Sequence, residues 1–192
     1  MITASSGDGG YGAQYPATSP YVVAVGGTTL ALNAGNSYKS ETAWANGGSG
    51  CSAYEAKPVW QADYGCAKRT EVDVSADADP NSGAAIYDTY GYLGWVQVGG
   101  TSLSSPLIAA VYALSGNTTN GTAPYSNPAA LHDVTSGSNG SCSPSYLCTA
   151  GVGYDGPTGL GTPNGLAAFG GAPPAPDFSL SVSPSSQGGV QG

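Results

Sequence analysis

The chain has 192 residues, of which 8% are charged, and its 12 Asp and Glu against 4 Lys and Arg give a formal net charge of −8. Four basic residues cannot form a surface that follows a phosphate backbone, so we expect no nucleic-acid partner. No apolar run approaches the roughly 18–20 residues of a membrane span, so we expect no membrane partner, and the 40% hydrophobic content argues against disorder over most of the length.

Three segments in the first hundred residues have the composition of β-strands. Residues 21–28 form a continuous apolar run of β-branched type that ends at a Gly-Gly pair, which is typical of a strand buried on both faces. Residues 70–75 form a shorter candidate strand. Residues 94–100 form a third, which again stops at a Gly-Gly pair.

The clearest helical pattern lies in residues 104–114. Its apolar residues recur at near-helical spacing, at Leu107, Ile108, Val111 and Leu114. Pro106 falls in the first turn, where proline is tolerated. A second short helix is predicted over residues 127–131. Buried strands mixed with helices predict an α/β fold with a mainly parallel sheet.

The four cysteines lie in two close pairs along the sequence. Local pairing joins Cys51 to Cys66 and Cys142 to Cys148, and each bridge would stabilise the fold by roughly 2–4 kcal/mol. Four cysteines allow three connectivities, so proximity favours this pairing without fixing it. A zinc site is the alternative, but the sequence has no Cys-x-x-Cys pair and a single histidine, His132. Disulfides, together with the low charge and the acidic balance, indicate a secreted, extracellular protein that tolerates low pH.

The composition changes near residue 170, where Pro, Gly and Ser become dominant. We therefore expect a globular domain over residues 1–170, and over residues 171–192 a linker with the stub of a following β-sandwich domain, whose first strand would be residues 178–184. The first residues have neither the basic start nor the apolar stretch of a signal peptide. We expect both ends of the chain to be cut ends.

Ser102 is the candidate nucleophile. It lies between a Gly-Gly strand end and the N-terminus of the predicted helix, where free N–H groups and a partial positive charge would stabilise a developing alkoxide and oxyanion. The alternative is that Ser102 or Ser104 only caps the helix.

Further motifs accompany this serine in a fixed order. Gly-Thr-Ser-x-Ser-x-Pro at residues 100–106, Ala-Ser-Ser-Gly-Asp-Gly-Gly at residues 4–10 and the segment 15–28 together resemble the sedolisins, the serine-carboxyl peptidases of the subtilisin-like superfamily. The resemblance covers residues 2–170. It implies a subtilisin-like, mainly parallel sheet with flanking helices, truncated at the N-terminus. It also implies that Asp8 is the oxyanion-hole residue and that Ser102 attacks peptide bonds in acid.

A fourth motif resembles the calcium site of that family. It comprises residues 132–137 and residues 150–161. The resemblance implies two carboxylates and three backbone carbonyls as ligands of Ca²⁺, from Asp133, Asp155, Val134, Gly151 and Gly153. Ca²⁺ prefers about six to eight oxygen ligands, which this set and water would supply. The alternative is an Asp-capped turn and a glycine-rich loop without metal.

The general base is where the chain departs from the family pattern. Sedolisins pair the serine with a Glu backed by an Asp on a helix that precedes the Ser-Gly-Asp segment, and this chain starts at that segment. His132, next to a calcium Asp, is badly placed to act as the base. The acids of the chain that could substitute are Glu41, Glu71, Asp73, Asp77, Asp79 and Asp88, which read more simply as turn caps, surface charges and, for Asp73, a buried structural carboxylate.

Two classes of function follow. The first is an acid endopeptidase domain, whose Glu/Asp pair lies upstream of this chain and whose substrates are proteins or peptides. The second is a secreted, calcium-binding fragment or pseudoenzyme, with at most weak esterase activity at Ser102. Because a truncated sheet exposes apolar strand edges, we also expect marginal stability or association through these edges.

Overall fold

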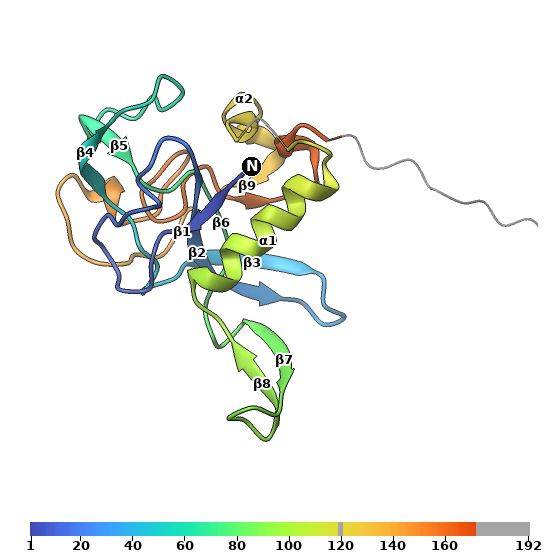
Figure 1. Cartoon of the computed structure of the whole chain (residues 1–192). Coiled ribbons are helices and arrows are strands. Elements are labelled where there is room, and N and C mark those ends of the chain that lie inside the picture. Colours follow the sequence, from blue (N-terminus) through green and yellow to red (C-terminus); the bar gives the residue numbers. More distant parts are fainter. Residues whose placement is uncertain (119–120, 172–192) are drawn as a thin grey trace, which may run out of the picture.

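The computed structural model describes residues 1–118 and 121–171. Its centre is a sheet built around β2 (Val23–Leu32), shown in Figure 1. β2 pairs in parallel with β1 (Thr3–Ser5) and with β6 (Val74–Asp77), and antiparallel with β3 (Tyr38–Ala43). The carboxyl ends of β1 and β6 therefore lie at one edge of the sheet.

The helix α1 (Thr101–Leu114) packs against β1, β2 and β6. Ile108 and Tyr112 on its inner side are buried against Val25 and Val74 of the sheet. The short 3-10 turn η3 (Ala167–Phe169) closes this core, where Phe169 meets Tyr112 edge to face at 4.9 Å between ring centroids. Because the helix begins at the carboxyl edge of the sheet, its N-terminus lies beside the ends of β1 and β6.

The other described strands form two-stranded antiparallel sheets. These are β4 (Cys51–Ala56) with β5 (Lys68–Thr70), β7 (Ala84–Asp88) with β8 (Gly94–Val98), and β9 (Leu131–His132) with β10 (Thr162–Pro163). The remaining helical turns are α2 (Ala123–Ser126), η1 (Pro128–Ala130) and η2 (Ser145–Leu147). Parallel pairing, as predicted, holds for the central strands β1, β2 and β6, whereas the other described pairs are antiparallel.

The first predicted strand is confirmed, but it does not end at its Gly-Gly pair. β2 continues through Gly26 and Gly27 to Leu32. A Cβ at Gly26 would lie 2.5 Å from the carbonyl oxygen of Pro157 and from Ser75 Oγ, and one at Gly27 would lie 2.6 Å from the Cβ of Ala78. These glycines let neighbouring segments approach a continuous strand, rather than ending it.

The other two strand predictions need correction. Residues 70–75 contain the end of β5 and the start of β6, with an irregular segment between them. Residues 94–98 form β8, but as one arm of a hairpin with β7, and Trp95 is exposed. A short turn joins β7 to β8, so the two strands can pair antiparallel with each other. Residues 94–98 therefore form a hairpin with β7 and do not join the central sheet.

The predicted helix over residues 104–114 is confirmed and starts earlier, at Thr101, so Pro106 lies inside it instead of in the first turn. Ile108 faces the core, but Leu107 and Leu114 are exposed, so the apolar face is wider than the contact with the sheet. Within the second predicted helix, over residues 127–131, the structure has the 3-10 helix η1 at Pro128–Ala130, followed by β9, and the separate short helix α2 ends just before it at Ser126.

Both predicted disulfides are present, Cys51–Cys66 and Cys142–Cys148. Among residues 1–118 and 121–171, no helix is long and apolar enough to cross a membrane. The strand predicted over residues 178–184 lies outside the described residues, as does most of the predicted linker at residues 171–192.

Candidate active site and metal site

The segment before α1 is shaped by two glycines. Gly100 has φ 89°, in the left-handed region that favours glycine. A Cβ at Gly99 would lie 2.5 Å from the carbonyl oxygen of Ala78 and from the nitrogen of Pro80. The backbone therefore turns sharply from β8 into the helix while it lies against the end of β6.

Asp8 is bound to the first residue of this helix. Its Oδ1 accepts hydrogen bonds from Thr101 N (2.7 Å) and Thr101 Oγ1 (2.8 Å), so it caps the helix N-terminus in place of Gly100, which has no side chain. Thr101 is fully buried, and its backbone and hydroxyl also accept hydrogen bonds from Ser5 Oγ (2.9 Å) and Gly7 N (3.1 Å). The loop after β1 and the start of α1 are thus joined at Thr101.

Asp8 is hydrogen-bonded to Thr101, the residue directly before Ser102 in the chain. Ser102 is the second helical residue and is exposed. Its hydroxyl forms no hydrogen bond with a side chain or backbone group of the described residues, so it does not serve as a helix cap. Ser104 is buried, and its hydroxyl donates to the carbonyls of Ala76 and Asp77. Ser104 therefore has a structural role, and Ser102 is the hydroxyl free to react.

None of the acids considered as a substitute base accepts a hydrogen bond from Ser102 within residues 1–118 and 121–171. Three of them cap their own turns, with Ser82, Asn81 and Tyr90 as the donors to Asp77, Asp79 and Asp88. Glu41 accepts hydrogen bonds from the hydroxyls of Thr28 and Thr162. These acids stabilise turns and strand contacts.

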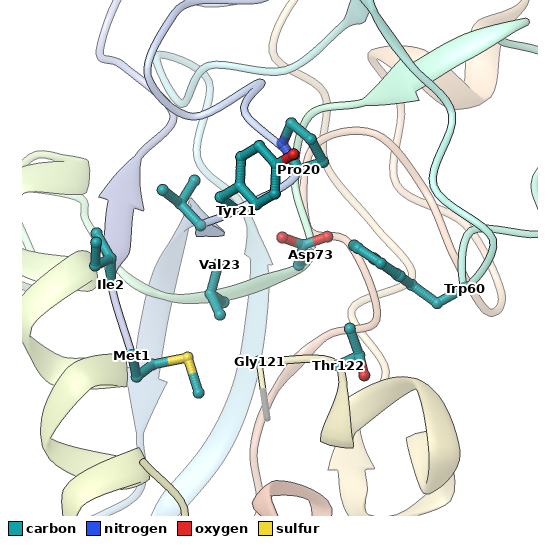
Figure 2. Close-up of a pocket in the computed structure, with 10 residues that line it drawn as sticks. Met1, Ile2, Pro20, Tyr21, Val23, Trp60, Asp73, Gly121 and Thr122 are labelled. Atoms are coloured by element: carbon teal, nitrogen blue, oxygen red, sulfur yellow. The ribbon is translucent and has the colours of Figure 1, made fainter. Parts of the chain in front are cut away.

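Asp73 is a buried structural carboxylate. Arg69 donates to both its oxygens, at 3.1 Å and 2.7 Å, and Tyr125 OH and Ala24 N donate to it at 2.7 Å and 2.8 Å. It also borders a surface cavity of about 390 Å³, where Figure 2 shows its carboxylate with Tyr21 and Trp60 to either side. Neither Asp8 nor Ser102 lines that cavity. Because its oxygens are already satisfied, Asp73 fixes the fold rather than moving protons.

Glu71 is the acid with the most perturbed surroundings. It is fully buried; Oε1 accepts a hydrogen bond from Gln14 N (3.1 Å), and Oε2 has no partner among the described groups. Burial raises the pKa of Glu71 from 4.5 to about 8, aided by the nearby Asp73 and opposed by the Gln14 hydrogen bond and Arg69. At acidic pH this side chain is neutral.

The residues expected to bind calcium come together after β9 and in the loop before β10. Asp133 Oδ2 accepts a hydrogen bond from Gly153 N, and Asp155 Oδ2 accepts one from Gly151 N, both at 2.9 Å. Val134 follows Asp133 directly and is buried. The loop places two carboxylates and a set of backbone carbonyls in one neighbourhood.

The electrostatics of this neighbourhood favour a cation. Asp155 is 1% exposed, and burial, aided by the Asp133 carboxylate, raises its pKa to about 7 against hydrogen bonds from Gly151 and Thr158. The ion pairs found among residues 1–118 and 121–171, Lys57–Asp63 and Arg69–Asp73, include neither carboxylate. The donors are all oxygens, as a hard cation requires, so the residues present fit calcium.

Three residues that hold Asp8 or the structural carboxylate Asp73 were not singled out from the sequence. In the sequence, Thr101 stands out only as part of the serine motif. In the structure it donates hydrogen bonds to Asp8 and accepts hydrogen bonds from Ser5 and Gly7. Arg69 and Tyr125 hold Asp73, but they lie 4 and 52 residues from it. The spacing of four at Arg69 could have suggested a pair; the position of Tyr125 carries no sequence signal.

Comparison with known proteins gives a consistent result. No protein-family model matches the chain. The chain is 40% identical over 174 residues to sedolisin from Pseudomonas sp. (strain 101) and 36% identical over 181 residues to xanthomonalisin from Xanthomonas sp. (strain T-22), and each alignment covers 79% of it. The chain spans only 29% and 21% of the lengths of these two relatives.

A solved structure agrees with the sequence relatives. The chain is similar to Pseudomonas sedolisin, a serine-carboxyl proteinase in complex with two molecules of pseudo-iodotyrostatin, with a TM-score of 0.71 and 34% sequence identity. The match covers 88% of this chain and 54% of that one. Sequence and fold similarity therefore both extend over most of the chain.

Proposed function

The chain belongs to the sedolisin family of serine-carboxyl peptidases, and we propose that it is the part of such a peptidase that carries the serine nucleophile. The observation that carries the proposal is the junction at Thr101, which binds the Asp8 carboxyl group at the helix N-terminus, one residue before the exposed Ser102, whose hydroxyl has no hydrogen-bond partner among the described residues. Its substrates are proteins or peptides.

In the proposed reaction, Ser102 Oγ attacks the scissile carbonyl carbon, and its proton passes to a carboxylate base. The carbonyl oxygen becomes an oxyanion. We assign to Asp8 the stabilisation of this oxyanion, with the carboxyl group as hydrogen-bond donor through Oδ2, while its Oδ1 stays bound to Thr101. A carboxylate base works at acidic pH because it titrates near the ambient pH.

In this proposal the base is not one of the described carboxylates of this chain. Two observations support this part of the proposal. No described carboxylate bonds to Ser102, and the chain spans 54% of the solved sedolisin chain that it matches. The same observations favour a second candidate, a non-catalytic calcium-binding domain that shares the fold but lacks a base and shows at most weak esterase activity.

The two candidates are separated by digestion of a protein substrate from about pH 3 to 7, measured for the chain and for Ser102→Ala. A peptidase loses activity by orders of magnitude in the variant, because removal of a nucleophile removes the covalent step. Equal background activity in both proteins identifies this chain as inactive alone. Acid activity that disappears in Ser102→Ala shows instead that one of its own carboxylates is the base.

We also propose that the loop with Asp133 and Asp155 binds Ca²⁺, with backbone carbonyls of Val134, Gly151 and Gly153 completing the site. The ion would be structural: its charge offsets two carboxylates and holds the loop after β9 to the loop before β10. Two disulfides in a chain of this size support secretion into an oxidising, calcium-rich medium.

Calcium binding predicts a higher melting temperature with Ca²⁺ than with EGTA. At a calcium concentration of 100 times Kd, the free energy of unfolding rises by about 2.7 kcal/mol. Asp133→Asn should abolish the shift, whereas Asp88→Asn, which changes a half-buried acid at the end of β7, should keep it. A melt that is the same in Ca²⁺, Mg²⁺ and EGTA rejects the site.

A further inference from the structure

The hairpin of β7 and β8, residues 84–98, projects away from the body of the molecule, as the green arms in Figure 1 show. Its composition is unusual for an exposed element. Asp88 is its single charged residue, and it contains three tyrosines and a tryptophan. A protruding element of a chain with net charge −8 is thus nearly neutral and aromatic.

Both faces of the hairpin carry apolar side chains. Tyr87 and Trp95 are cross-strand partners, 63% and 75% exposed, with ring centroids 5.4 Å apart in an edge-to-face arrangement. On the opposite face Ile86 pairs with Val96. Tyr90 and Leu93 at the turn are also exposed. A two-stranded hairpin is only marginally stable in water by itself. Exposed apolar side chains gathered on such an element therefore indicate an interaction site.

The base of the hairpin is fixed beside the nucleophile. Gly100 N donates to the carbonyl of Ala78 (2.5 Å), and Ala78 N donates to the carbonyl of Thr28 (2.8 Å), so the end of β8 is held to the carboxyl edge of the sheet. Val98 is four residues from Ser102, a separation that spans at most about 14 Å. A substrate at Ser102 therefore lies within a few residues of the hairpin.

The hairpin also offers unpaired backbone. Among the described strands, β7 and β8 pair only with each other, so each has one open edge. An extended peptide can add to such an edge as a further strand, with backbone hydrogen bonds for affinity and side-chain contacts for selectivity. The peptide substrate of a peptidase is extended where it enters the site. An extended peptide is therefore a suitable occupant both for the Ser102 site and for the open edge of the hairpin.

We propose that the β7–β8 hairpin is an accessory binding surface for the substrate polypeptide. A stretch of substrate several residues away from the scissile bond lies along the open edge of the hairpin and packs its apolar side chains on Tyr87 and Trp95. This inference rests on the proposed peptidase function and adds a selectivity to it. Long, unfolded, apolar chains bind more tightly than short peptides, and salt has little effect because the surface is nearly neutral.

Binding is tested in the Ser102→Ala background, so that the probe is not cleaved and the result does not depend on catalysis. The probe is fluorescein-labelled ribonuclease A, reduced and carbamidomethylated so that it stays unfolded, and its anisotropy reports binding. Removing both aromatic rings with Tyr87→Ser and Trp95→Ser should weaken binding about tenfold or more. Tyr87→Phe with Trp95→Phe should retain it.

The matched control is Tyr54→Ser with Tyr64→Ser, which removes two other exposed rings far from residues 84–98 in the sequence. Its binding should equal that of the parent. Equal affinity in the hairpin variant and the parent, or an equal loss in the control, overturns the proposal, as does the absence of binding to the parent. A change of sedimentation mass in the hairpin variant alone would also overturn it, because the surface would then be an interface between copies of the chain. If the parent chain with Ser102 intact digests no protein while the Ser102→Ala chain binds the probe, the peptidase function is contradicted and the binding surface stands.

Discussion

Asp8 has one observed role and one proposed role, and they use different oxygens of its carboxyl group. One oxygen caps α1 through Thr101, and the other is the candidate donor to an oxyanion. The cap fixes the orientation of the Asp8 carboxyl group, because two hydrogen bonds from Thr101 hold Oδ1 at the helix N-terminus. Gly100 makes this arrangement possible, since a Cβ there would lie 2.6 Å from Asp8 Oδ2.

Glu71 makes the fold sensitive to pH. Its pKa is about 8 in the folded chain and near 4.5 in an unfolded one, so between these values the folded state holds a proton that the unfolded state has lost. The free energy of unfolding therefore falls as pH rises from about 4.5 to 8 and is highest below this window.

Glu71→Gln removes this dependence, because an amide is neutral at every pH. The variant should be more stable than the parent at pH 8, by an amount on the order of 1–4 kcal/mol, and about equal to it at pH 4. Urea unfolding at both pH values measures the difference. A parent chain whose stability does not fall over this window contradicts the buried, protonated state of Glu71.

At the residue scale, the sequence identified residues that lie in recognisable motifs. It missed residues whose roles depend on their buried contacts in the fold. Asp8 and Ser102 each lie in a local motif, and the structure bonds Asp8 to Thr101, the residue before Ser102. Asp73 was predicted as a buried structural carboxylate and is one. The partners of Asp73 could not be predicted, because Tyr125 is 52 residues away and reaches it only through the tertiary fold.

At the scale of elements, glycine was the residue most easily misread. A Gly-Gly pair predicted the end of a strand in residues 21–28, yet β2 passes through it, because close contact with another segment also requires glycine. Periodicity predicted α1 well. It could not tell a buried strand from a hairpin arm in residues 94–98, because both are short apolar runs.

Gly26→Ala tests the packing around β2. A methyl group there would lie 2.5 Å from Pro157 O and Ser75 Oγ and 2.8 Å from Val72 Cγ1, all in the buried interior. We expect a loss of several kcal/mol, about 2–4, because overpacked cores must shift backbone or side chains.

Gly9→Ala is the control for this substitution, since its Cβ would meet nothing closer than 4.0 Å. It should change stability by less than about 1 kcal/mol. Denaturant titration of both variants gives the comparison. Equal stability of Gly26→Ala and the parent would falsify the close packing of β2.

At the scale of the whole molecule, one side of the chain is apolar and open. The outer side of α1 exposes Leu107 and Leu114, and the first residues, Met1 and Ile2, are exposed next to the edge strand β1. Among the described strands β1 pairs with β2 alone. Open strand edges and apolar helix faces favour contacts between copies of a chain.

We therefore predict that the chain self-associates as its concentration rises. Leu107→Lys with Leu114→Lys should lower the association by adding charge to the outer side of α1, and sedimentation equilibrium would show it as a return toward the monomer mass of 18.8 kDa. A parent chain that stays monomeric over the whole concentration range and melts cooperatively without calcium argues against the prediction.

The junction at Thr101 also has a consequence for the time at which activity can arise. The hydrogen bonds from Thr101 to Asp8 join residues 93 positions apart. Contacts between such distant residues form late in folding, because a long loop must close first. A chain emerging from the ribosome, or crossing a membrane unfolded, carries the serine without its neighbouring carboxyl group. The proposed activity, which depends on this junction, is therefore expected only after these distant segments have come together.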